Sequence, residues 1–82
     1  MFGLFGKSEF NKEMEDLDKE YKILGDEMLN TMKSFDFQKQ MLTLKAMAAN
    51  CELKVQCCKR HGELDEMKKW EAAKLQALQL HG

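Results

Sequence analysis

Two cysteines and a histidine in the middle of the chain are the residues whose spacing could support chemistry. Cys57 and Cys58 precede His61 by four and three positions, so a thiolate and an imidazole could share a metal ion on one helix face. A structural zinc site normally has four ligands, and the other candidates are Cys51, nearly two helical turns away, and His81 at the far end of the chain. We therefore expect small, buried, unreactive side chains at these cysteines and predict neither a metal nor a cofactor.

Other reactive groups lack the arrangement that catalysis requires. Carboxylates are frequent between residues 13 and 27, where a helix would hold them on a solvated face. Without a pocket they do not act as general acids or bases. The sequence has no nucleophile elbow and no glycine-rich phosphate-binding loop. We expect no enzyme activity.

The cysteines and His61 belong to the stretch 36–61, which carries two apolar stripes at helical spacing. A helix with two apolar stripes is typically a middle helix, covered from both sides. The first stripe comprises Phe37, Met41, Leu44, Ala48, Cys51 and Val55. The second comprises Leu42, Ala46, Ala49, Leu53 and Cys57. Polar residues separate the stripes, with Gln40, Thr43, Asn50 and Lys54 on one of the two polar sides.

The segment before residue 36 is predicted to form a helix that begins after an N-cap at Ser8 and carries a narrow, coiled-coil-like seam. The seam consists of Phe10, Met14, Leu17, Tyr21, Leu24, Met28, Met32 and Phe35. A turn at Gly25-Asp26 is one alternative, and a turn at Ser34-Phe35-Asp36 is the preferred one, because the seam continues through Gly25 without a break in phase. Residues 8–35 are net acidic and residues 36–61 net basic, which favours pairing of the two helices.

The C-terminal segment has two interpretations. A basic last turn followed by Gly62 predicts a helix end and a third helix over 63–80. A straight helix through Gly62 would instead continue both stripes in phase, at a cost of about 1 kcal/mol for the glycine. We prefer three helices, although two helices with an overlong second one remain open.

Composition indicates one small helical domain. The chain has 82 residues, 44% of them hydrophobic and 33% charged, with no proline and a net charge of −1. Three cysteines, two of them adjacent, make a poor disulfide framework and favour a cytoplasmic location. No segment is long enough to span a membrane. With a single arginine and no net positive charge, nucleic acid is not an expected partner.

We expect an all-α fold, either an antiparallel helical hairpin or a three-helix bundle with coiled-coil-like heptad packing, in a homodimer. Residues 1–7 would form a flexible apolar tail and residues 8–82 a single helical domain. The predicted function is that of a non-enzymatic protein–protein interaction module that binds a second copy or another protein's helix. The expected contacts are Leu42, Ala49, Leu53, Leu64, Met67, Trp70 and Leu78. The alternative is a peripheral membrane regulator that touches lipid through Phe2, Leu4 and Phe5.

Overall fold

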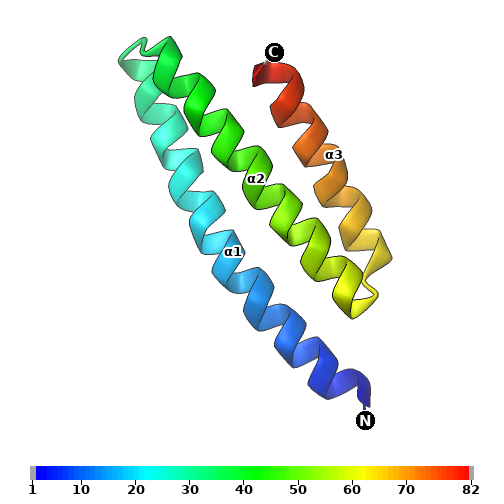
Figure 1. Cartoon of the computed structure of the whole chain (residues 1–82). Coiled ribbons are helices and arrows are strands. Elements are labelled where there is room, and N and C mark those ends of the chain that lie inside the picture. The colour runs from blue at the N-terminus through cyan, green and yellow to red at the C-terminus, as the bar shows by residue number, and fades with distance from the viewer. Residues whose placement is uncertain (1, 82) are drawn as a thin grey trace.

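Three helices form an elongated, up-down-up bundle in the computed structural model (Figure 1). Helix α1 spans Phe2–Lys33, α2 spans Phe37–His61 and α3 spans Leu64–His81. The structure describes the backbone of residues 2–81 and the side chains of residues 8–80. Helix α2 lies between α1 and α3 and runs antiparallel to both, and the Cα atoms extend over 51 × 20 × 13 Å. The three-helix interpretation is therefore correct, and the overlong second helix is excluded.

The turn between α1 and α2 falls at Ser34-Phe35-Asp36, as preferred from the sequence. Asp36 caps α2 by accepting a hydrogen bond from the Lys39 backbone N–H over 3.0 Å, which satisfies one of the free donors of the first turn. Gly25 lies within α1 and does not interrupt it. Helix α1 begins at Phe2, before the expected N-cap at Ser8. The side chains of residues 1–7 lie outside the described part of the chain. The predicted flexibility of this segment stays a prediction.

The second turn is built on Gly62. Its backbone adopts φ 71° and ψ 21°, the left-handed conformation that glycine reaches without a steric cost. The N–H groups of Gly62 and Glu63 donate to the carbonyls of Lys59 and Cys58 over 3.3 and 2.9 Å. This pair of hydrogen bonds is a Schellman motif, the common way to end a helix.

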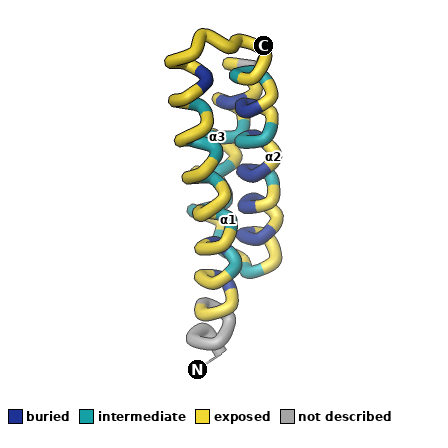
Figure 2. The backbone as a smooth tube through the Cα atoms, turned by 90° about the vertical axis from the view of Figure 1, so that its left-hand side faces the viewer, coloured by how far each residue is buried: buried dark blue, intermediate teal, exposed yellow. Residues whose placement is uncertain are grey.

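Buried positions gather along α2, whereas α1 and α3 face solvent over much of their circumference (Figure 2). The first apolar stripe of α2 is buried from Leu44 to Val55, whereas Met41 is half-buried and Phe37, its first member, is 66% exposed. The seam of α1 is buried or half-buried from Phe10 to Met28, but its last members, Met32 and Phe35, are exposed. Coiled-coil packing along the seam and dimerisation stay predictions.

The second stripe of α2 is open at Leu42, Ala49 and Leu53, although its last member, Cys57, is buried against α1. This corrects the expectation that both stripes are buried in a middle helix. Leu42 and Leu53 are 63% and 53% exposed. Helix α1 packs instead on the polar side of α2, where Thr43, Asn50 and Lys54 are buried. It can do so because it supplies polar partners, among them the Leu17 carbonyl, to which the Asn50 amide donates over 3.0 Å. Helix α2 thus buries a polar strip and exposes an apolar one.

Candidate partner-binding groove

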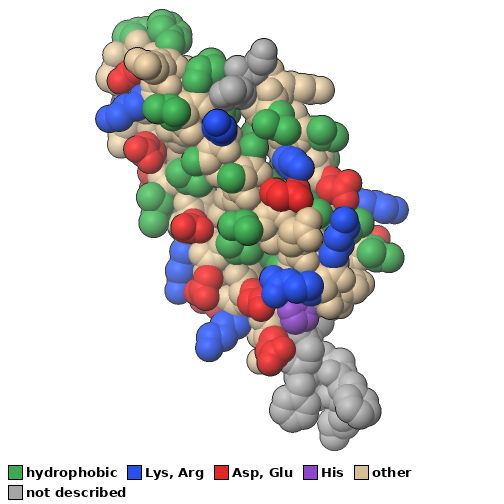
Figure 3. Space-filling view, in the orientation of Figure 1, with side chains coloured by type: hydrophobic (Ala, Val, Ile, Leu, Met, Phe, Trp, Pro, Cys, Tyr) green, Lys and Arg blue, Asp and Glu red, His purple; other side chains and the backbone are tan. Residues whose placement is uncertain are grey.

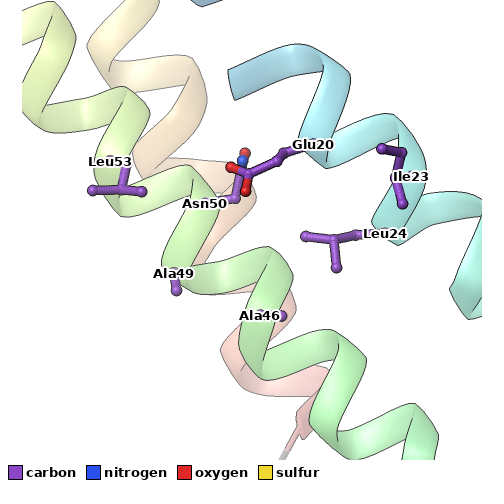
Figure 4. A pocket seen from close by; sticks show the side chains of 7 residues that line it. All are labelled: Glu20, Ile23, Leu24, Ala46, Ala49, Asn50 and Leu53. Carbon is purple, nitrogen blue, oxygen red and sulfur yellow. The ribbon is translucent and has the colours of Figure 1, made fainter. Parts of the chain in front are cut away.

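The exposed stripe of α2 and the neighbouring side of α1 form a shallow apolar groove, here called the α1–α2 groove (Figure 4). Its hollow encloses about 460 Å³. It is lined by Ile23, Leu24 and Glu20 of α1 and by Ala46, Ala49, Asn50 and Leu53 of α2. The two alanines keep its floor low, while Ile23, which is 65% exposed, and Leu53 stand at its edges. Branched apolar side chains around a floor of small residues fit the apolar face of an added helix.

The groove continues toward the C-terminal end of α2. An adjoining hollow shares Leu53 and is lined further by Leu17, Gln56, Glu13, Asp16 and Arg60. Exposed acidic residues, Asp16 and Glu20, therefore stand on the α1 side. The exposed Arg60 stands on the α2 side. The groove has an apolar floor with acidic residues on its α1 side, and Arg60, which pairs with Glu13, stands on the α2 side of the adjoining hollow.

The structure separates the predicted contact residues into three groups. Leu42, Ala49 and Leu53 are exposed on one stripe of α2, and two of them line the groove. Leu64 and Leu78 are 58% and 42% exposed but belong to α3, and neither lines the groove. Hydrophobic side chains also reach the surface elsewhere along the bundle, interspersed with charged ones (Figure 3).

Met67 and Trp70 are half-buried and pack against the core, and a contact of theirs with a partner stays a prediction. Both contact a cluster formed by Phe10, Met14, Cys57 and Cys58. Leu64 and Met67 would continue a stripe of α2 in phase only if the helix ran straight through Gly62. The turn at Gly62 breaks that continuity. Trp70 is half-buried, and its ring meets that of Tyr21 edge-on with centroids 5.7 Å apart. Trp70 therefore joins α3 to α1.

Lys54 lies at the point where the three helices meet and was not singled out by the sequence. Its side chain is fully buried, and its Nζ lies 2.8 Å from Asp18 Oδ1. The same Nζ lies 4.2 Å from the centroid of the Tyr21 ring and 3.6 Å from that of Trp70. An ammonium held against two aromatic faces gains cation–π attraction, which is strongest where water is excluded. These contacts fix how α1 and α3 sit on α2.

A second polar cluster joins α1 to the C-terminal end of α2. The Cys57 thiol donates to Glu13 Oε2 over 2.9 Å, and Arg60 Nη2 donates to the same oxygen over 3.3 Å. His61 Nε2 lies 3.2 Å from that oxygen. The thiol hydrogen bond is the main cause that lowers the pKa of Glu13, with His61 and Arg60 adding to it. Burial and Glu13 together raise the pKa of Cys57 to about 12.

This cluster revises the Cys57-Cys58-His61 group considered from the sequence. Of the two adjacent cysteines, Cys57 has its sulfur beside His61 and Glu13, whereas Cys58 is not part of that group. The third member is Glu13, from a helix more than forty positions earlier. No spacing rule within one helix could have found it, because the contact depends on how α1 is rotated against α2.

No described helix is long and apolar enough to cross a membrane. Phe2, Leu4 and Phe5, the residues of the membrane alternative, have side chains outside the described part of the chain. Contact with lipid through them therefore stays a prediction.

Comparison with known proteins found no matching family model, no matching curated protein and no matching solved structure.

Proposed function

We propose that this protein is a helical interaction module and that a second copy of the chain occupies the α1–α2 groove. The observation that carries the proposal is the inverted burial of α2, which buries Asn50 and Lys54 while exposing Leu42 and Leu53. Burying one such leucine fully contributes about 1.5–3 kcal/mol. A small chain that leaves this stripe open gains stability when a second apolar face covers it.

Charge supports a second copy as the occupant. Residues 8–35 hold eight acidic and four basic side chains, net −4, and residues 36–61 hold two acidic and five basic ones, net +3. In a two-fold dimer each contact is made twice, so α1 of one copy can lie beside α2 of the other. Asp16 and Glu20 would then face a basic helix that carries Lys45 and Arg60. Complementary charges of this kind set orientation and speed of association more than affinity.

A cytoplasmic location is part of the proposal and is supported by the cysteines. Cys51, Cys57 and Cys58 are all buried free thiols, as expected for proteins of reducing compartments.

Sedimentation equilibrium of the full chain with matched variants tests the proposal. Leu53→Glu places a charge in the groove, and Leu75→Glu is its control, because Leu75 is 59% exposed but lies on the α2–α3 side. We expect the wild-type chain and Leu75→Glu to form dimers and Leu53→Glu to sediment as a monomer. A wild-type monomer at tens of micromolar would rule out the second copy as occupant. Dimers in all three samples would place the interface elsewhere.

A further inference from the structure

Three atoms that can ligate a metal, one from α1 and two from α2, lie close together at the C-terminal end of α2. The Glu13 carboxylate, the Cys57 thiol and the His61 imidazole each offer one atom, and all these atoms lie within 4.8 Å of one another. We propose that Glu13, Cys57 and His61 bind a divalent transition metal, with Zn²⁺ as the best-fitting ion. This inference does not rest on the proposed dimer, because all three ligands come from one chain, although Glu13 also lines the hollow that continues the α1–α2 groove.

The donor set selects the class of metal. Zinc accepts thiolate, imidazole and carboxylate ligands at about 2.0–2.3 Å, whereas magnesium and calcium prefer oxygen atoms alone. Cys57 and His61 are one helical turn apart and share a face, and Glu13 approaches from the facing helix. The Nε2–Oε2 separation of 3.2 Å is close to the spacing of about 3.3 Å expected around a tetrahedral zinc ion, whereas the Sγ–Oε2 separation of 2.9 Å would have to widen to about 3.5 Å.

The charges of the ion and of its ligands balance when the metal binds. Cys57 gives its proton to the buffer, its sulfur bonds the metal, and the hydrated ion exchanges three waters for protein ligands while it keeps at least one. One thiolate and one carboxylate balance the two charges of the ion, and His61 coordinates as the neutral imidazole. Arg60, which pairs with Glu13 at 3.3 Å, must turn away, and its side chain is 64% exposed and therefore free to do so.

Burial places the fourth coordination position toward solvent. The Cys57 side chain is fully buried, the His61 side chain is 16% exposed and the Glu13 side chain is 41% exposed. The ion would thus bind at the surface edge of the cluster with a water as its fourth ligand, an arrangement of three protein ligands that zinc accepts. Because its ligands come from α1 and α2, the ion would also hold α1 against the end of α2.

Cobalt and zinc titrations of the chelator-treated full chain test the site. Co²⁺ bound by a thiolate gives a charge-transfer absorption band, and we expect this band to saturate at one Co²⁺ per chain and to disappear when Zn²⁺ is added. Cys57→Ala should lose the band, and Cys58→Ala should keep it, because Cys58 is an adjacent, equally buried thiol outside the cluster. Circular dichroism of each variant confirms that it is folded.

A second measurement keeps the test decisive if Cys57→Ala does not fold. His61→Gln removes a ligand at a partly exposed position, so Zn²⁺ should raise the melting temperature of the wild-type chain and of Cys58→Ala but not that of His61→Gln. A wild-type chain without a charge-transfer band would overturn the proposal. So would a band that survives Cys57→Ala or a band that is lost in Cys58→Ala.

Discussion

At the scale of single residues, Lys54 determines how the helices fit together. It contacts Asp18 and Tyr21 of α1 and Trp70 of α3 from its position on α2, so it links all three helices. Its ammonium is fully buried, whereas the Asp18 side chain is 56% exposed. Desolvation offsets much of the attraction in such a pair, so its main contribution is to specify one arrangement of the helices.

This asymmetry predicts different effects for the two partners of the ion pair. Asp18→Asn leaves a buried ammonium without its counter-charge and should lower the free energy of unfolding by about 1–3 kcal/mol. Lys54→Met removes the buried charge, keeps the volume and leaves a hydrated Asp18, so it should change stability by less than about 1 kcal/mol. Urea unfolding followed by fluorescence of Trp70, the single tryptophan, measures both. A larger loss for Lys54→Met than for Asp18→Asn would contradict this account.

Two buried weak acids near this point predict a loss of stability in alkali. Burial raises the pKa of Tyr21 above its ordinary 10.0 and that of Cys51 above 9.0, and the proximity of Cys51 raises the pKa of Tyr21 further. The unfolded chain releases these protons first, so the contribution of these two groups to the free energy of unfolding should be constant below about pH 9 and fall as pH rises beyond it. Tyr21→Phe removes one titration and should make the fall above about pH 10 shallower. Urea unfolding of the wild-type chain and of Tyr21→Phe across this pH range measures the effect. Parallel curves of the free energy of unfolding against pH for the two proteins would contradict the prediction.

At the scale of the elements, both helix ends use the same hydrogen-bond pattern with different residues. After α1 the N–H of Asp36 donates to the Thr31 carbonyl over 3.0 Å, and the N–H of Phe35 donates to the Met32 carbonyl over 3.3 Å. This is the Schellman motif also found at Gly62. Here, however, the left-handed position is held by Phe35, with φ 55°. A phenylalanine in this conformation is strained by about 1–2 kcal/mol.

The two turns therefore predict opposite effects of exchanging side chains at equivalent positions. Phe35→Gly relieves the strain and removes a ring that is 77% exposed, so it should raise the free energy of unfolding by about 0.5–1 kcal/mol after the entropy of glycine is included. Gly62→Ala adds strain at φ 71° and should lower it by about 1 kcal/mol. Thermal unfolding in dilute solution checks both signs. Stabilisation by Gly62→Ala would show that the Gly62 backbone is not held in the left-handed conformation.

The helix ends that the sequence predicted are those marked by local chemistry. The turn at Ser34-Phe35-Asp36 and the helix end at Gly62 after a basic turn are signalled within a few residues, and the structure confirms both. The strained turn at Phe35 has no such signal, since phenylalanine rarely adopts a left-handed backbone. The helical backbone before Ser8 was not predicted, because the sequence analysis placed the start of the helix at an N-cap on Ser8.

The contacts between helices were much less predictable. Lys54 was assigned to a polar side of α2, and Glu13 to a solvated face of α1, yet both make long-range contacts across a helix interface. Periodicity identifies which residues share a face, but it does not determine which face a neighbour covers. The buried polar strip of α2 depended on partners that only the packed helices bring together, such as Asp18 and the Leu17 carbonyl.

At the scale of the whole molecule, the arrangement of the three helices explains why an apolar stripe remains open. Helix α3 covers the first stripe of α2 and α1 covers its polar strip, so none of the three helices covers Leu42, Ala49 and Leu53. The chain is small enough to bury only about 60–65% of its unfolded surface. A second copy, with its acidic α1 beside the basic α2, is the occupant that we propose for this surface.

The most direct test of that central claim uses two methyl-bearing residues that occur once each in the chain. Ile23 is the single isoleucine and lines the groove, and Val55 is the single valine and is 3% exposed beneath α3. Selective methyl labelling therefore gives one reporter of the groove and one control in the core. In an equal mixture of labelled and unlabelled chains, isotope-filtered nuclear Overhauser spectra detect only contacts between copies. We predict such contacts for Ile23 and none for Val55. The account would be contradicted by intermolecular contacts that involve Val55 but not Ile23. It would also be contradicted if no contacts were seen at a concentration where the chain is dimeric.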